Sequence, residues 1–271
     1  MVDCAEGTQF QFRRNKFHDA RLDHVFITHL HGDHCLGLIG LLSTFSLLGR
    51  TRDFHVFAPA EFGDILSAQV DFFIPNVTFN VVFHPIASYD CGVIYEGKQL
   101  TVRAFPLNHR VPCYGFLFTE NNDERHIIPE CIRKYAIPHE AIPGIKRGED
   151  FMTADGRLVP NAELTTPPEC PRSFAYCSDT KFMETAPEAL QGVNLLYHES
   201  TYAESEASLA EAMYHSTARQ AALFAMKCHA KRLLIGHFSS RYDDESPLLA
   251  EAQSVFPETL LAKENLVIEI V

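Results

Sequence analysis

The sequence predicts an α/β fold. Segments with the apolar patterns of strands and of helices alternate along most of the 271 residues, and no internal repeat or low-complexity tract interrupts them. The chain is long enough to bury a large core, and its 46% hydrophobic and 21% charged residues are typical of a globular protein. Polar, histidine-rich turns follow several of the predicted strands, as expected where an α/β sheet carries a functional site. We therefore expect one α/β domain, with room for an insertion.

In the first half of the chain, short apolar runs bounded by turn residues predict strands, and longer apolar stretches predict helices. The run LDHVFIT predicts a buried strand, and LGLIGLLSTFSLL predicts an apolar helix. The later runs 99–106 and 113–119 predict an antiparallel pair of strands. The strands expected are 22–28, 55–59, 78–86, 99–106 and 113–119, and the helices are 36–48 and 60–73.

The same alternation resumes after residue 172. One helix has a clear start, since Thr217 and Gln220 form the sequence pattern of a capping box. The strands expected here are 173–178, 194–198, 231–235 and 266–270, and the helices are 209–212, 217–229 and 247–255.

Between these halves, residues 129–171 break the pattern, since they hold seven of the fifteen prolines and show little periodicity. A long irregular stretch inside a compact domain is typical of a functional excursion or a lid. A disordered surface loop is the alternative, although the segment contains many isoleucines and aromatic residues for a disordered one.

Charge and cysteine content restrict the partners. A net charge of −12 repels nucleic acid, so an RNA substrate would require local basic patches or bound metal. The eight cysteines are scattered without CxxC spacing, which favours reduced thiols in a cytoplasm. The sequence has neither an apolar run long enough for a membrane span nor the pattern of a signal peptide, so we expect a soluble, unexported protein without a membrane partner.

The stretch THLHGDH places three histidines and an aspartate directly after the first predicted strand. Side chains alternate along an extended segment, so His29 and His31 point the same way and can bind one ion together. We expect Gly32 to adopt a positive φ and allow a sharp turn. Asp33 and His34 can then face a second ion from the start of the next helix. The alternative is a solvated, histidine-rich turn.

A dinuclear site needs further ligands, and three residues that follow later strands are candidates: His109, Asp179 and His237. Imidazole and carboxylate groups suit zinc, and the carboxylate of Asp179 can bridge two ions. His215 and Glu199 are candidates for proton transfer, because a carboxylate beside an imidazole favours the protonated form. A purely structural His–Glu pair is the alternative.

With these motifs in place, the chain resembles the ribonuclease Z family of the metallo-β-lactamase superfamily. The resemblance runs from Asp3 to the last predicted strand, and its most specific part extends from Phe26 to Arg50. The matching stretches are FITHLHGDHCLGLIGLLSTFSLLGR, LNHRVPCYGF, YCSDT, HEST with HSTARQA, and IGHFSSRY.

The resemblance implies a metallo-β-lactamase αβ/βα sandwich over residues 1–271, with an inserted arm at 121–171 that clamps the transfer RNA. It implies two zinc ions per subunit, with manganese or another divalent ion as the alternative. His29, His31 and His109 would hold one ion, Asp33, His34 and His237 would hold the other, and Asp179 would bridge them.

The implied reaction is hydrolysis of precursor transfer RNA by zinc-activated water, which leaves a 3′-hydroxyl on the transfer RNA and a 5′-phosphate on the trailer. Asp33 would accept a proton, and His215, oriented by Glu199, would protonate the departing 3′ oxygen. The family also implies a cytoplasmic homodimer. Basic residues that could contact RNA are Arg13, Arg14, Lys16 and Arg21 near the N-terminus, although these also fit a solvated loop, and Lys146 and Arg147 at the tip of the arm.

The sequence departs from the family at its start, where DCAEGTQ stands in place of DCGEGTQ and the usual preceding strand pair is missing. We expect a truncated form, a misassigned start codon, or a shortened protein with an exposed sheet edge. No proposed metal ligand is lost. Other activities compatible with the site are phosphodiester hydrolysis of other substrates and 3′ exonuclease action, and an inactive scaffold is the non-enzymatic alternative.

Overall fold

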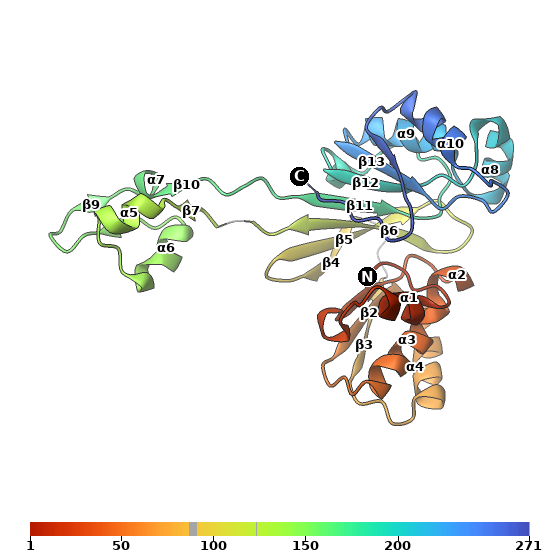
Figure 1. The fold of residues 1–271 in the computed structure, drawn as a ribbon, viewed down its shortest axis with the longest axis horizontal. Helices are drawn as coiled ribbons and strands as arrows, with labels where there is room; N and C mark the ends of the chain where they lie inside the picture. The colour runs from red at the N-terminus through yellow and green to blue at the C-terminus, as the bar shows by residue number, and fades with distance from the viewer. Residues whose placement is uncertain (87–90, 123, 271) are drawn as a thin grey trace. The chain divides into compact units, whose positions relative to one another are not determined.

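The computed structural model describes residues 1–86, 91–122 and 124–270 (Figure 1). The chain forms two compact units. Unit 1 comprises Met1–Glu96, Thr101–Phe118 and Ser173–Val271, and unit 2 comprises Gly97–Leu100 and Thr119–Arg172. No helix in the described residues has both the length and the apolar character needed to cross a membrane.

The N-terminal part of unit 1 is a parallel three-stranded sheet covered by helices on one face. Its strand order is β1-β2-β3, and Val2 adds a single bridge to Phe26 of β1. Apolar side chains of the sheet and of the long helices form one buried core, which includes Val25, Leu41 and Phe54. The elements are α1 (Thr8–Arg14), η1 (Asp19–Arg21), β1 (His24–Phe26), α2 (Gly32–Cys35), α3 (Gly37–Leu47), β2 (Phe54–Pro59), α4 (Phe62–Phe73) and β3 (Val81–Ile86).

The C-terminal part of unit 1 is built on a seven-stranded sheet with the order β14-β13-β12-β11-β6-β5-β4. Strands β11 to β14 are parallel, whereas β4 and β5 are antiparallel. Small alanine side chains let α9 lie close to the sheet over a second buried core. The elements are β4 (Gly92–Glu96), β5 (Leu100–Leu107), β6 (Cys113–Glu120), β11 (Ser173–Cys177), η3 (Glu188–Leu190), β12 (Leu195–Glu199), η4 (Glu204–Glu206), α8 (Ala207–Met213), α9 (Ala218–Lys227), β13 (Arg232–Gly236), α10 (Ser246–Gln253) and β14 (Thr259–Leu261).

The two sheets of unit 1 meet through aromatic side chains. The Phe26 ring lies 5.6 Å from the Phe116 ring and 5.4 Å from the Phe118 ring, measured between centroids. Helices therefore cover the outer faces of two packed sheets (Figure 1), which is the expected αβ/βα sandwich. Parallel strands of both sheets end near one edge, and the residues that follow those strands carry the candidate site.

Unit 2, which contains the whole proline-rich segment 129–171, has short elements of its own. Two of its prolines, Pro129 and Pro143, lie in the first turn of a helix, where the missing N–H removes no hydrogen bond. A small buried core, which includes Ile145 and Leu164, holds these elements together. The elements are β7 (His126–Ile127), α5 (Pro129–Lys134), η2 (His139–Ala141), α6 (Ile142–Lys146), β8 (Phe151–Met152), β9 (Leu158–Val159), α7 (Asn161–Leu164) and β10 (Thr165–Thr166).

One predicted strand is wrong. The last strand is Thr259–Leu261, which pairs with β13, and residues 266–270 form no strand. Instead Leu266, Ile268 and Ile270 line an apolar groove together with Phe174 and other side chains of the sheet. Their alternating apolar pattern thus reflects packing on a sheet face rather than pairing at its edge. Helix α1 and strand β4 were not predicted from the sequence.

Candidate metal centre

The histidine-rich turn follows β1 and leads into α2. Thr28 and His29 are fully buried, and His31 is the residue before the first helical position, Gly32. Gly32 does not have the positive φ that we expected. The turn is made without that conformation, and Asp33 and His34 lie in the first turn of the short helix α2.

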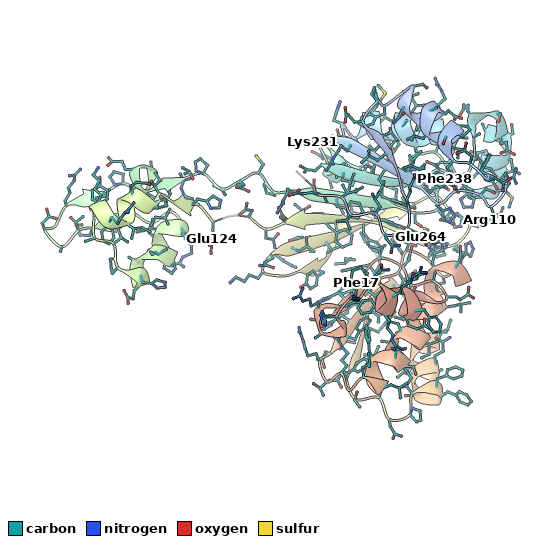
Figure 2. All side chains as sticks on the ribbon, viewed as in Figure 1. Phe17, Arg110, Glu124, Lys231, Phe238 and Glu264 are labelled. Carbon is teal, nitrogen blue, oxygen red and sulfur yellow. The ribbon has the colours of Figure 1, made fainter. Side chains whose placement is uncertain are left out.

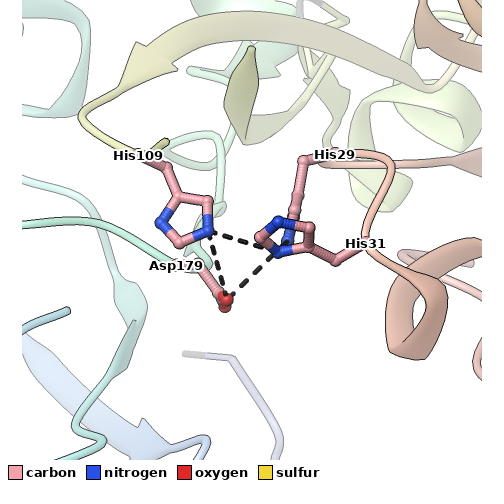
Figure 3. Close-up of side chains that lie close together, drawn as sticks. All are labelled: His29, His31, His109 and Asp179. Atoms are coloured by element: carbon pink, nitrogen blue, oxygen red, sulfur yellow. Dashed lines mark hydrogen bonds and ion pairs between the residues drawn. The ribbon is translucent and has the colours of Figure 1, made fainter. Parts of the chain in front are cut away.

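Four side chains form the first group of possible ligands, and Figure 3 shows them converging. Nε2 of His29 lies 3.0 Å from Nδ1 of His31, and Nε2 of His109 lies 3.3 Å from the same atom. Oδ2 of Asp179 is 3.7 Å from His29 Nε2 and 3.9 Å from His109 Nε2. Residues that follow β1, β5 and β11 thus meet at one point.

Asp33, His34 and His237 form the second group. Nε2 of His34 lies 3.4 Å from Oδ2 of Asp33 and 3.7 Å from Oδ1 of Asp179. Nε2 of His237 lies 3.2 Å from the same Asp179 oxygen. The two carboxylate oxygens of Asp179 therefore face different groups, as a bridging ligand requires.

The donor atoms fit a divalent metal. Nε2 of His34 is buried and has no hydrogen-bond partner among the described atoms, which is costly unless another group satisfies it. Six imidazole or carboxylate side chains surround Asp179, and such nitrogen and oxygen donors suit zinc. A third, overlapping group contains Asp179, His215 and His237, so geometry alone also allows His215 to be a ligand.

Outer contacts orient the imidazole rings. Nδ1 of His34 lies 2.8 Å from Oδ2 of Asp3, and Nδ1 of His29 lies 3.0 Å from the hydroxyl of Thr28, which itself donates to Asp3. Nδ1 of His109 lies 3.0 Å from the carbonyl oxygen of Tyr214. Because these contacts use the Nδ1 atoms of the three histidines, their Nε2 atoms remain available to bind an ion. Hydrogen bonds to the other nitrogen of a metal-binding histidine fix both the orientation and the tautomer of its ring.

Neither Asp3 nor Thr28 was predicted from the sequence to be a site residue. Asp3 reaches the site because the chain beside it packs tightly on the start of α3, where a Cβ on Gly37 would lie 1.7 Å from the carbonyl oxygen of Ala5. The backbone N–H of Gly37 donates to Cys4 at 2.9 Å. The resemblance of DCAEGTQ to the family segment was the sequence signal that could have pointed to Asp3, but it did not reveal that Asp3 contacts His34 and Thr28.

The electrostatics of the cluster favour neutral imidazoles at His29 and His109 but not at His34, where burial alone would lower the pKa but the hydrogen bond and charge of Asp3 outweigh it and raise that pKa. Burial, assisted by the neighbouring histidines, lowers the pKa of His29 to about 3, and burial also lowers the pKa of His109. Burial acts against a charged Asp179, but His237, His34 and His29 outweigh it and bring the pKa of Asp179 below its ordinary value. Neutral imidazoles and an ionised carboxylate are the forms that bind a metal.

Glu199 and His215 form a pair beside this cluster. Glu199 ends β12 and is fully buried, and its Oε1 lies 2.9 Å from Nδ1 of His215. The same oxygen accepts hydrogen bonds from the backbone N–H groups of Thr180 and Ser216. Burial alone would lower the pKa of His215, but the hydrogen bond and the charge of Glu199 outweigh it and raise that pKa.

The predicted capping box at the start of α9 is confirmed. The side chain of Thr217 accepts from the N–H of Gln220, and the Gln220 side chain accepts from the N–H of Thr217. This fixes the N-cap of the helix, Thr217, two residues after His215. The His215 ring lies 5.5 Å from the rings of both His109 and His237.

The basic residues considered for RNA binding have different surroundings. Arg13 and Arg14, in the last turn of α1, are exposed, as are Lys16 and Arg21. Within unit 2, Lys146 makes an ion pair of 2.6 Å with Glu124, which Figure 2 labels, and Arg147 makes one of 3.2 Å with Glu149. The charges of the two unit 2 residues are thus partly compensated.

Comparisons with known proteins agree with this arrangement. The family described as "Beta-lactamase superfamily domain" matches residues 1–131. The chain is 47% identical to the ribonuclease Z of Bacteroides fragilis over 270 residues, covering 100% of this chain and 89% of the relative. It is 46% identical to the ribonuclease Z of Porphyromonas gingivalis, with the same coverage of 100% and 89%.

One solved structure supports the same family, and a second supports the fold. The short form of human tRNase Z superposes with a TM-score of 0.69 at 25% identity, covering 100% of this chain and 87% of that one. A long form of RNase Z from yeast superposes with a TM-score of 0.64 at 16% identity over 97% of this chain and 35% of that one, which supports the fold alone. With the full-length similarity to bacterial relatives, these findings place the chain in the ribonuclease Z family, with a metallo-β-lactamase fold.

Proposed function

We propose that the protein is a zinc-dependent endoribonuclease that removes the 3′ trailer from precursor transfer RNA. The products would be a transfer RNA with a 3′-hydroxyl and a trailer with a 5′-phosphate. One observation carries the proposal: seven possible metal ligands form two adjoining groups beside the pair of His215 and the buried Glu199, in a chain 47% identical to a ribonuclease Z. Phosphodiester hydrolysis needs positive charge at the phosphate, which metal ions held by these residues would supply, and a proton for the leaving oxygen, which His215 would supply.

Two zinc ions fit the donor set. His29, His31 and His109 would hold one, Asp33, His34 and His237 would hold the other, and Asp179 would bind both. When bound, zinc polarises a phosphoryl oxygen and lowers the pKa of water. Manganese or another divalent ion would use the same nitrogen and oxygen donors.

The chain's own residues would move the protons. The Asp33 side chain is 69% exposed, so Oδ2 can take a proton from the attacking water and release it to solvent. Because Glu199 engages Nδ1 of His215, Nε2 is the nitrogen that remains for the departing 3′ oxygen. The raised pKa of His215 increases the protonated fraction near neutral pH, as a general acid requires.

Substrate binding would use residues outside the cluster. We propose that the insertion at 121–171 clamps the body of the transfer RNA and that Arg13, Arg14 and Lys16 contact its backbone. Because the chain carries a net charge of −12, an RNA would be attracted only by such local basic groups. The ion pairs of Lys146 and Arg147 lead us to expect smaller contributions from these two residues.

We also propose a homodimer in the cytoplasm. Helices α1 and α3 contact each other, and large apolar side chains on them and at the C-cap of α3 are exposed, namely Phe10 (68% exposed), Leu47 (87%) and Leu48 (60%). An apolar surface of this kind is typical of a protein–protein interface. All eight cysteines are unpaired, which fits a reducing compartment. Light scattering would report the mass, and Leu47→Asp should shift a dimer toward monomer.

The deciding experiment compares two substrates. The purified protein, with zinc or with manganese, is incubated with a 3′-extended transfer RNA precursor and separately with bis-p-nitrophenyl phosphate. We expect one cut at the 3′ end of the transfer RNA and a trailer that a 5′-phosphate-dependent exonuclease degrades. Cleavage of the small ester alone would refute the proposal in favour of another phosphodiesterase, and stepwise shortening of the precursor would favour an exonuclease. A protein that binds no metal and cuts neither substrate would be an inactive scaffold.

A further inference from the structure

The hydroxyl of Thr201 lies between a possible metal ligand and the proton-donor pair. Its Oγ1 is 2.8 Å from Oε2 of Glu199 and 3.0 Å from Nδ1 of His237. It also lies 3.0 Å from the carbonyl oxygen of His237 and 3.3 Å from Nδ1 of His215. Thr201 is only 6% exposed, so water competes little for these contacts.

The hydrogen atoms in this group can be assigned by counting donors and acceptors. A hydroxyl has one proton to donate and two lone pairs, whereas a carboxylate only accepts. The shortest contact of the hydroxyl is to Glu199, so its proton belongs on that bond. Nδ1 of His215 has a closer acceptor, Oε1 of Glu199, at 2.9 Å. A lone pair of Thr201 is therefore left to accept a proton from Nδ1 of His237.

This assignment fixes the tautomer of His237. With its proton on Nδ1, the neutral ring has a lone pair on Nε2, the atom that lies 3.2 Å from Oδ1 of Asp179. If the Thr201 hydroxyl instead donated to Nδ1, Nε2 would carry the proton and would be unable to bind an ion. Glu199 would at the same time lose the hydrogen bond from that hydroxyl.

We propose that Thr201 is a positioning residue through which Glu199 sets the tautomer of His237 while it orients His215 directly. One buried carboxylate thus directs both a ligand of the second ion and the proton donor. The inference rests on the proposed function as a two-ion hydrolase. It extends that proposal, because the metal ligand His237 and the proton donor His215 would depend on the same chain of hydrogen bonds. Loss of a hydrogen bond that orients a metal ligand typically weakens metal affinity by about 10 to 100-fold.

The neighbouring residue provides a matched control. Ser200 is fully buried like Glu199, but its hydroxyl has no hydrogen-bond partner among the described atoms. Ser200→Ala removes a buried hydroxyl next to Thr201 and leaves intact the hydrogen bonds that link Glu199 to His237 through Thr201. Thr201→Val keeps the shape of the side chain and removes its hydroxyl, and Thr201→Ser keeps the hydroxyl.

The test measures zinc per chain as a competing chelator is titrated, together with turnover of the precursor RNA. We expect two zinc ions in the unaltered protein and in Ser200→Ala. Thr201→Val should bind one of the two about 10 to 100-fold more weakly and turn over more slowly, and Thr201→Ser should recover both properties. If Thr201→Val bound each of the two zinc ions as tightly as the unaltered protein does, the inference would be overturned. If the unaltered protein bound fewer than two ions or cut no RNA, the proposed function itself would fail.

A second measurement does not depend on any variant folding. Nitrogen-15 spectra of the histidines in the metal-free protein distinguish the two ring tautomers. We expect His237 to carry its proton on Nδ1, and a proton on Nε2 would overturn the inference.

Discussion

His215 could be a metal ligand or a general acid, and the two roles predict opposite effects of its removal on the zinc content. It lies within 4.8 Å of Asp179 and His237, close enough to be a metal ligand, yet its Nδ1 is engaged by Glu199. We predict that His215→Ala lowers kcat on precursor RNA and leaves the zinc content unchanged. General acids contribute about 10² to 10⁴-fold, and we expect about 10³-fold here because the Glu199 contact holds the ring in a fixed orientation.

The fold should tolerate this change. Glu199 loses one partner but keeps hydrogen bonds from the N–H groups of Thr180, Ser216 and Thr201 and from the Thr201 hydroxyl. Loss of one hydrogen bond to a buried charged group costs about 1–3 kcal/mol, which is less than the stability of a typical domain. Thermal denaturation would verify that the variant is folded at the assay temperature.

Two substrates separate the roles of acid and ligand. Bis-p-nitrophenyl phosphate releases an anion that is stable near neutral pH and needs no proton, so its hydrolysis should fall much less than RNA cleavage. The control is His229→Ala, which removes an exposed histidine away from the cluster. If the His215 variant lost one zinc ion, or if both substrates slowed equally, the role of general acid would be wrong.

Three further predictions concern metal affinity and stability. Asp3→Ala should weaken zinc binding by about 10 to 100-fold in a chelator competition, because His34 and Thr28 lose their shared acceptor; unchanged affinity would contradict this. Arg50→Met should cost about 3–5 kcal/mol in urea unfolding, because the buried guanidinium donates to Asp23 and to the carbonyl oxygens of Leu22 and Asp53. Arg52→Met is its control, since that arginine is 63% exposed and its ion pair with Asp23 should be worth less than about 1 kcal/mol. Burial, followed by repulsion from His55, lowers the pKa of His24 to about 4 from 6.5, so the unfolded chain binds more protons between these values. Stability should therefore decrease as pH falls from about 6.5 to about 4, and His24→Phe should lose less stability than the unaltered protein over that range; an equal loss would refute the assignment.

The elements that the sequence predicted well are those whose signals are local. Strand β1 and helix α3 each follow from a mostly apolar run, and α9 follows from its capping box. The strand predicted at 266–270 is wrong because periodicity reports that one face of a segment is apolar and does not say what covers it. There the apolar side chains lie on a sheet face, and the last strand forms earlier, where β13 offers a free edge.

The sequence by itself determined the chemistry of half the candidate site. His29, His31, Asp33 and His34 lie within six residues, so alternation along an extended segment and one helical turn already bring them close. Only the tertiary structure brought His109, Asp179 and His237 to the same point, with the two oxygens of Asp179 facing different groups. It also decided the hydrogen bonds of Asp3, Thr28 and Thr201, which join residues up to 36 positions apart. The physical reason is that backbone periodicity acts over a few residues, whereas the order of strands in a sheet and the packing of two sheets depend on the whole chain.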